Sequence, residues 1–343
     1  MNKKKFKYNN LVRQSNLLSF LNPTSKGTKY WESPPKSDLS SRQIGRIILQ
    51  FHQTVFLFEN LGVDFKNKNL LDIGTGNGMI PSLISKFTKI KYSDGIDPYL
   101  DGEHTTSWQK HNRSKEREKI FNKIKNLVKK NNNILDFDHY KKTTKFENIF
   151  LKPSKSNLIN KKNYKYNFYQ KDALEISSLK RKYDLVYCKA LEHIPNYEKL
   201  LDEIAKVTKK KSLVYFKHRS FFSFLGAHRY ASTFIPWGHV FLNKNEIKEY
   251  VKIYHKNREK QFLNFFYNEL STPRFTVNDF IKKASEKNLN LKIIITEPYK
   301  KLDKALNLIK NRKLFFKKIN KNYSTLSSDE LFSGMHHIFL ERV

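Results

Sequence analysis

The sequence has little cysteine: Cys188 is the single one in 343 residues. A disulfide within the chain and a cysteine-rich zinc site are therefore excluded. Long apolar runs are absent too, since no uncharged stretch reaches the ~18–20 residues that a membrane span needs. The basic start of the chain is followed by no apolar segment of signal-peptide length. We therefore expect a cytoplasmic protein without a transmembrane segment.

Acidic residues are also scarce. The chain has 32 Asp and Glu against 66 Lys and Arg, which gives a formal net charge of +34. Such a charge indicates an anionic partner, such as nucleic acid, an acidic glycan or a membrane surface. Lysine far outnumbers arginine, however, and a coding bias of the genome would produce the same charge. Sequence-specific nucleic-acid readers favour arginine for bidentate contacts. Nucleic acid is therefore a partner that the sequence allows but does not favour.

Helix and strand patterns alternate along the chain after a polar N-terminal arm, 1–40. The 27 Phe and 18 Tyr are not typical of a disordered chain. Apolar residues at helical spacing predict a helix from Ser41 to about Gly62. Further helices are expected at 79–87 and 197–208, and strands at 69–73, 90–96, 166–170, 183–188, 212–217, 291–296 and 337–341. This order predicts an α/β fold with a seven-stranded, mostly parallel sheet and helices on both faces.

Two segments interrupt the domain, which we expect to span 41–343. The first, 105–165, has 17 Lys and Arg against 5 Asp and Glu and includes a predicted helix at 115–130. We interpret it as a basic insertion, with a solvated excursion of no function as the alternative. The second, 218–290, is rich in aromatic residues. It is interpreted as a lid or acceptor segment, with a packed structural loop as the alternative.

A glycine-rich turn follows the first predicted strand, in the segment Leu70–Ser85. Gly74 and Gly76 permit a tight turn and let a ligand lie on the backbone, and Gly78 allows a close approach where the next helix begins. Dinucleotide-binding loops have the spacing G-x-G-x-x-G, whereas this loop has G-x-G-x-G. Asp72 precedes the loop and would repel a pyrophosphate, but it would attract a cationic ligand.

These residues resemble motif I of the class I S-adenosylmethionine-dependent methyltransferase family, D-x-G-x-G-x-G. The resemblance extends over about residues 41–217, with a gap at the basic insertion, and implies that S-adenosylmethionine is the cofactor. It also implies that Asp97, with Pro98 beside it, binds the ribose hydroxyls. A carboxylate suits a diol because it accepts both hydroxyl hydrogens.

Two later positions complete the resemblance. Asp172, with Ala173 beside it, is similar to the acidic residue that contacts the adenine edge in that family. The end of the strand at 183–188 resembles the family's motif IV region, although Lys189 departs from the small or polar residue common there. All these positions fall at carboxyl ends of predicted parallel strands, where ligands of such sheets bind.

Methyl transfer needs positioning and, for many acceptors, a base. His193 and His218 follow the fourth and fifth predicted strands, and His239 belongs to the aromatic segment. We take these three as candidate catalytic residues, with structural hydrogen bonding as the alternative for each. The spacings of His218, His228 and His239 match no compact ligand pattern, so no metal site is expected. Cys188 is interpreted as a buried structural thiol.

Three functions remain open on the sequence. The favoured one is a methyltransferase that modifies an oxygen or nitrogen of a small-molecule or glycan acceptor. The second is an RNA methyltransferase that uses the basic surface. The third is a protein that binds the cofactor without catalysis.

Overall fold

The computed structural model describes residues 11–13, 41–76, 78–98, 136–144, 151–155, 158–226, 233–269 and 274–343. Most of the predicted N-terminal arm, the predicted helix at 115–130 and His228 lie outside these residues. Within the described part of the chain, no helix is both long and apolar enough to cross a membrane.

Seven strands form one sheet in the order β3-β2-β1-β4-β5-β7-β6. Their bounds are β1 Asn69–Ile73, β2 Tyr92–Asp97, β3 Tyr166–Gln170, β4 Tyr183–Cys188, β5 Thr208–His218, β6 Leu289–Pro298 and β7 Ser333–Arg342. β1 pairs in parallel with β2 and β4, and β2 pairs in parallel with β3. The predicted seven-stranded, mostly parallel α/β fold is confirmed.

The chain divides into two compact units. We call the first the glycine-loop unit; it comprises 34–189, 203–215 and 342–343. The second, the aromatic unit, comprises 1–33, 190–202 and 216–341. The predicted boundaries of the insertion and the lid remain predictions.

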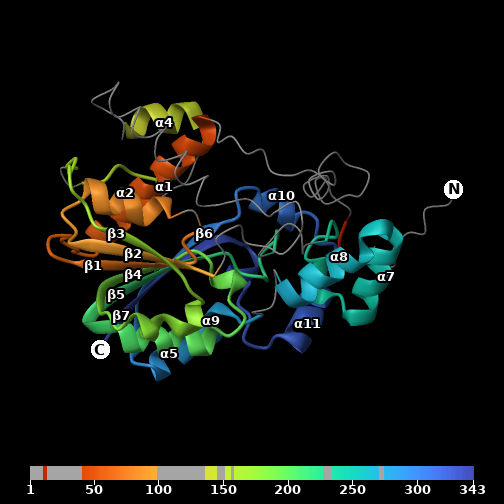
Figure 1. Cartoon of the computed structure of the whole chain (residues 1–343). Helices are drawn as coiled ribbons and strands as arrows, with labels where there is room; N and C mark the ends of the chain where they lie inside the picture. The colour runs from red at the N-terminus through yellow and green to blue at the C-terminus, as the bar shows by residue number, and fades with distance from the viewer. Residues whose placement is uncertain are drawn as a thin grey trace. The chain divides into compact units, whose positions relative to one another are not determined.

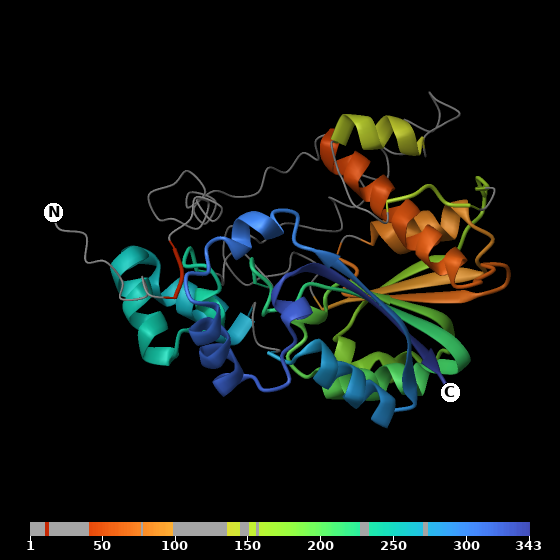
Figure 2. The ribbon, with the colours of Figure 1, turned by 180° about the vertical axis from the view of Figure 1, so that it is seen from behind.

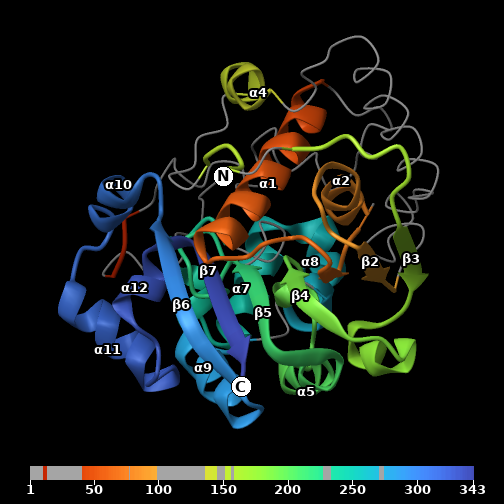
Figure 3. The same ribbon diagram turned by 90° about the vertical axis from the view of Figure 1, so that its left-hand side faces the viewer.

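Helical elements accompany strands β1 to β4 in the glycine-loop unit. They are α1 Ser41–Asn60, α2 Met79–Phe87, α4 Phe137–Thr144, the 3₁₀ segment Ala173–Leu179 and the end of α5 Tyr197–Val207. α2 lies along one face of the sheet (Figure 1), and the end of α5 lies on the opposite side of β4 (Figure 3). α4 packs on α1 at Gly45, where an added Cβ would lie 2.5 Å from Thr144. The described part of the predicted insertion therefore contributes a packed helix.

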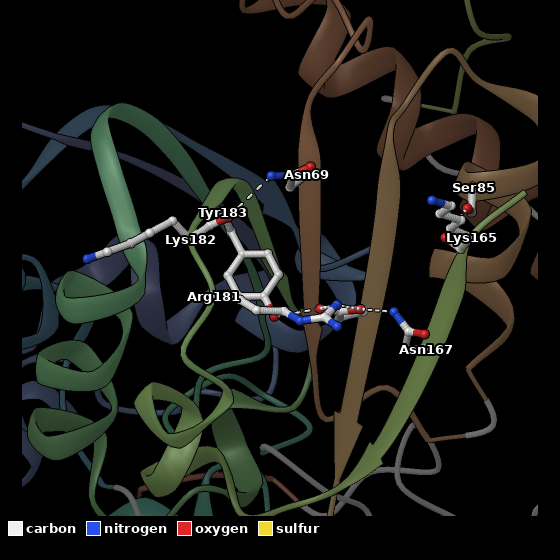
Figure 4. A network of polar contacts seen from close by, with 8 residues as sticks. Asn69, Ser85, Lys165, Asn167, Arg181, Lys182 and Tyr183 are labelled. Atoms are coloured by element: carbon white, nitrogen blue, oxygen red, sulfur yellow. Dashed lines mark hydrogen bonds and ion pairs between the residues drawn. The ribbon is translucent and has the colours of Figure 1, made fainter.

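A buried carboxylate on β2 connects this strand with β3 and with the start of β4. Asp94, which is fully buried, accepts hydrogen bonds from Tyr183 (2.7 Å), Asn167 (2.8 Å) and Arg181 (3.0 Å). Figure 4 shows these three donors, which come from the start of β4, from β3 and from the turn before β4. A buried charge needs such partners, since an unpaired one would cost several kcal/mol.

The aromatic unit has its own core. Its elements are the 3₁₀ turn Leu191–His193, α6 Gly238–Phe241, α7 Lys244–Tyr254, the 3₁₀ turn Lys256–Arg258, α8 Glu259–Asn264, the π turn Phe265–Glu269, α9 Val277–Glu286, α10 Leu302–Leu306, α11 Arg312–Asn322 and α12 Ser328–Leu331. α7 packs against α8, as Figures 1 and 2 show from opposite sides. Trp237 is fully buried and donates its Nε1 hydrogen to the Leu331 carbonyl oxygen at 3.0 Å. Phe222 and Phe224 belong to the same core. These aromatic side chains pack in the interior of the unit, and the interpretation of 218–290 as a lid or acceptor segment remains a prediction.

Candidate active site

The glycine loop joins β1 to α2 in a backbone conformation that side chains disfavour. Gly74, Gly76 and Gly78 have φ angles of 66°, 57° and 71°, a region that costs most residues roughly 1 kcal/mol or more. An ideal Cβ added at Gly76 would meet no atom within 4 Å. The backbone at Gly76 therefore faces open space, so a ligand can lie directly against it.

Asp72 lies under this loop at the end of β1 and is only 3% exposed. Thr75 donates its hydroxyl hydrogen to Asp72 Oδ2 at 2.7 Å. Burial raises the pKa of Asp72 to about 7, and the charge of Asp97 adds to that effect, whereas Thr75 and Lys189 oppose it. The ionised form of Asp72 is therefore poorly compensated within the protein, and a cationic ligand would stabilise it.

Asp97, the last residue of β2, is tied to the glycine loop. The Gly76 backbone N–H donates to Asp97 Oδ2 at 2.9 Å, and the Lys171 N–H donates to the Asp97 carbonyl oxygen at 3.1 Å. Pro98 follows on the surface, where its carbonyl oxygen accepts a hydrogen bond from Gln170. The structure thus places the ends of β1, β2 and β3 around the loop, as their predicted positions required.

Asp172 follows β3 and caps the 3₁₀ segment that begins at Ala173. Its Oδ1 accepts a hydrogen bond from the Leu174 N–H at 2.8 Å. Asp172 is exposed, whereas Ala173 is buried. A role at the adenine edge is compatible with an exposed carboxylate at this strand end, and it remains a proposal.

Lys189, which follows β4, belongs to a chain of hydrogen bonds with two residues that the sequence did not single out. Its Nζ donates to Gln50 Oε1 at 3.2 Å, and Gln50 Nε2 donates to the Tyr187 hydroxyl at 3.0 Å. Gln50 belongs to α1. The spacing of apolar residues predicts this helix but does not indicate that the Gln50 side chain takes part in a site. Thr75 lies within the glycine-loop motif. Its position close to Asp72 in the sequence could have identified it as a hydrogen-bond partner of that carboxyl group.

In the aromatic unit, His218 ends β5 in a buried environment. Its side chain is 2% exposed and its Nδ1 lies 3.9 Å from Glu192 Oε2. The imidazole stacks on Phe275, with ring centroids 5.4 Å apart, and on His336 at 6.4 Å. Neither ring nitrogen of His218 has a hydrogen-bond partner among the described residues. A buried imidazole in this state can still exchange a proton with a bound ligand.

The neighbours of His218 differ in charge. Burial opposes ionisation of Glu192, but the contact with His218 and the charge of His193 outweigh it and lower the pKa of Glu192. Burial lowers the pKa of His336 to about 3, and the charge of His218 contributes. At neutral pH, His218 therefore has an anionic neighbour and a neutral one.

The other two predicted catalytic histidines have different surroundings. His193 ends the turn Leu191–His193, is half-buried and acts electrostatically on Glu192. The Nε2 of His239 lies 3.1 Å from the Ser223 carbonyl oxygen, and its ring meets Phe221 edge-on. Burial lowers the pKa of His239 to about 4. The contacts of His239 are those of a residue packed in the aromatic core.

Glu330 is a further buried carboxyl group that sequence reasoning missed. Its oxygens accept hydrogen bonds from the Ser220 hydroxyl at 2.5 Å and the Val277 N–H at 3.0 Å. Burial raises the pKa of Glu330, while these hydrogen bonds and the charge of His218 oppose the increase. Among the described residues, no group of three His, Cys, Asp or Glu side chains could hold a metal ion. Cys188 is buried at the end of β4.

A family model described as a methyltransferase domain matches residues 42–252, which is more than half of the chain. No curated protein sequence matches the chain.

Solved structures of methyltransferases resemble the chain at low identity. The Synechocystis magnesium protoporphyrin IX methyltransferase, crystallised with bound S-adenosylhomocysteine, is 8% identical, with 95% of this chain and 98% of that chain covered and a TM-score of 0.39. A Haemonchus contortus phosphoethanolamine N-methyltransferase is 14% identical, with 84% and 52% covered and a TM-score of 0.39.

The fold and the glycine loop define an enzyme that uses S-adenosylmethionine to transfer a methyl group, as the sequence predicted. The chain belongs to the methyltransferase domain family.

Proposed function

We propose that this enzyme methylates an oxygen or nitrogen atom of a small-molecule or glycan acceptor, with His218 as the base. The observation that supports the base most strongly is the buried His218 imidazole beside the Glu192 carboxylate. Two features support a small-molecule or glycan acceptor. The strand end at Lys189 resembles the motif IV region of the family, and the aromatic unit contains a polar hollow.

The glycine-loop unit would hold the cofactor through residues that the motif identifies. Asp72 would face its ammonium group, Asp97 and Pro98 its ribose, and Asp172 and Ala173 its adenine. Gly74, Gly76 and Gly78 leave the backbone accessible for this contact. Lys189 lowers the pKa of Asp72 and so helps to keep that carboxyl group ionised. When bound, the cofactor supplies an electrophilic methyl group.

The aromatic unit would remove the acceptor's proton. As the acceptor oxygen or nitrogen forms its bond to carbon, its proton moves to a ring nitrogen of His218. Glu192 stabilises the resulting imidazolium, and the neutral His336 does not oppose it. His193, which acts electrostatically on Glu192, is the second candidate. The packed surroundings of His239 make it the weakest of the three candidates.

A hollow of about 460 Å³ in the same unit is a candidate acceptor site. It is lined in part by Pro195, Tyr197, Arg274 and Phe275. Phe275 contacts both Tyr197, at a centroid distance of 4.3 Å, and His218. Its size falls within the ~300–1,000 Å³ range of ligand pockets, and it combines aromatic rings with charged groups.

The cofactor assignment is tested with Asp97→Asn. An asparagine oxygen can still accept the Gly76 N–H, so the loop should keep its conformation while the charge is lost. Loss of a charge-assisted hydrogen bond, worth ~1.5–3 kcal/mol, should weaken S-adenosylmethionine binding roughly 10- to 100-fold in calorimetry. Asp138→Asn, on the exposed face of α4, is the matched control. Unchanged affinity of Asp97→Asn would refute the ribose assignment.

The base assignment is tested with His218→Asn in a methyl-transfer assay over a panel of hydroxyl and amine acceptors. The turnover number should fall roughly 100-fold or more with little change in cofactor affinity, since general bases contribute ~10²–10⁴. His139→Asn, on the exposed face of α4, is the control. Normal turnover of His218→Asn would remove it as the base.

An RNA methyltransferase is the second candidate, and the hollow described in the next section favours it. A non-catalytic cofactor-binding protein is the third. Tight cofactor binding without turnover on any acceptor, RNA included, would select the third.

A further inference from the structure

Six lysines line one hollow of about 650 Å³ in the glycine-loop unit: Lys66, Lys89, Lys91, Lys161, Lys162 and Lys165. We call it the lysine hollow. Among the described residues that line it, none is Asp or Glu. Tyr164, two asparagines and two isoleucines complete the lining. Like charges gathered in one concavity repel each other unless an anion neutralises them, so the arrangement fits an anionic ligand.

The walls of the lysine hollow are held by hydrogen bonds between segments that are far apart in sequence. The Ser85 hydroxyl donates to the Lys165 carbonyl oxygen at 2.6 Å, and Figure 4 shows the two residues side by side. The Lys161 ammonium donates to the Ile90 carbonyl oxygen at 2.8 Å, and the Lys91 N–H donates to the Lys68 carbonyl oxygen. The lysines are therefore presented on a preformed surface.

One of the lysines that line the hollow, Lys161, is partly desolvated, and burial lowers its pKa. Lys86 lies over the Tyr164 ring, 4.9 Å from its centroid. Phosphate oxygens would restore the solvation that the Lys161 ammonium group loses, and an aromatic ring next to cations is typical of grooves that bind single-stranded nucleic acid.

The lysine hollow is at the opposite end of the strands from the cofactor loop. Lys66 precedes β1, Lys91 precedes β2 and Lys165 precedes β3, whereas Gly74, which opens the loop, follows β1. Strands of five or six residues separate the two edges by roughly 15–20 Å. A small anion in the hollow could not also be the methyl acceptor. A long polyanion could extend beyond it.

We propose that the lysine hollow binds the phosphodiester backbone of single-stranded RNA. The concave shape disfavours a membrane surface, which is flat on this scale. The Tyr164 ring and the asparagine amides offer stacking and hydrogen bonds that bases use and that inorganic polyphosphate cannot. The proposal does not rest on the acceptor or base assignments made above.

The test uses the full chain and a fluorescent oligouridylate in anisotropy titrations at several salt concentrations. The variant Lys89→Gln/Lys91→Gln/Lys162→Gln removes three exposed lysines whose side chains have no structural role in the described residues. The matched control is Lys244→Gln/Lys248→Gln/Lys252→Gln on the exposed side of α7. Circular dichroism should show that both variants are folded.

If the three lysines each neutralise one phosphate, the slope of log K against log salt should fall by about 2, since each single-strand contact contributes ~0.7. Binding at about 0.1 M salt should weaken roughly 100-fold in the hollow variant and less than threefold in the control. Equal losses in both variants would overturn the proposal and leave a diffuse charge from coding bias. Wild-type affinity that is the same for anionic vesicles or inorganic polyphosphate would also overturn it.

Discussion

Replacing Asp72 by asparagine should abolish proton release on cofactor binding. The pKa of this buried carboxyl group is raised from 3.8 to about 7. At pH 6 about 90% of Asp72 is then protonated in the free enzyme, and at pH 7 about half. A cofactor ammonium group beside it would return the pKa toward its ordinary value. Binding should therefore release about 0.9 proton at pH 6 and about 0.5 at pH 7.

The assay is calorimetry with S-adenosylhomocysteine in two buffers that differ in ionisation enthalpy. The ligand's own amino group stays charged at pH 6, since α-amino groups titrate near ~8, so the released proton comes from the protein. Asp72→Asn should release none, and Asp138→Asn should behave as wild type. A wild-type value near zero at pH 6 would refute the claim that Asp72 faces the ammonium group.

The same shift has a consequence for stability. Because the pKa in the folded state lies above its ordinary value, the contribution of Asp72 to stability is complete below about pH 4 and is lost as the pH rises through about 7. A shift of about three units corresponds to an upper bound of about 4 kcal/mol. Cofactor-free Asp72→Asn should therefore resist urea better than wild type at pH 8, and the two should be equally stable at pH 4.

Four further predictions follow from the packing and the sites. Asp94→Ala should cost roughly 1–3 kcal/mol of unfolding free energy in urea titrations, since it leaves the buried Tyr183 hydroxyl without its acceptor and removes the hydrogen bonds from the partly exposed Asn167 and Arg181; full stability would contradict the network. Phe224→Ala should cost roughly 3–5 kcal/mol through a cavity in the aromatic core, and a loss under 1 kcal/mol would show that this core is loosely packed. Gly76→Ala should cost only ~1–2 kcal/mol of stability but weaken cofactor binding tenfold or more in calorimetry; unchanged binding would place the ligand elsewhere. Glu192→Gln should lower the turnover number with little change in cofactor affinity, because the imidazolium that forms on His218 loses its anionic neighbour; an unchanged turnover number would exclude Glu192 as the partner of His218.

The strands that carry the cofactor residues could be predicted well because their patterns are local. β1, β3 and β4 have the predicted bounds, and so does α2, since each is an apolar or aromatic run between clear turn residues. β5 begins four residues before its predicted start. The sequence pattern predicts a loop at the run of lysines near the start of β5. The strand nevertheless includes these residues, because backbone pairing does not depend on the nature of the side chains.

The cluster around His218 could not be predicted in this way. Glu192, Phe275 and His336 come from three distant segments, and no sequence spacing relates them. Composition alone did not show which aromatic side chains are buried; the structure shows Trp237 in the core. The lysine hollow was equally hidden: its lysines come from three segments, of which only 161–165 belonged to the predicted basic insertion.

The most direct measurement of the central claim is a crystal structure with S-adenosylhomocysteine bound. The account predicts both ribose hydroxyls within roughly 2.5–3.2 Å of the Asp97 carboxylate oxygens, the ligand's ammonium group beside Asp72, and the adenine beside Asp172 and Ala173. A ligand whose ribose hydroxyls contact neither oxygen of Asp97 would contradict it.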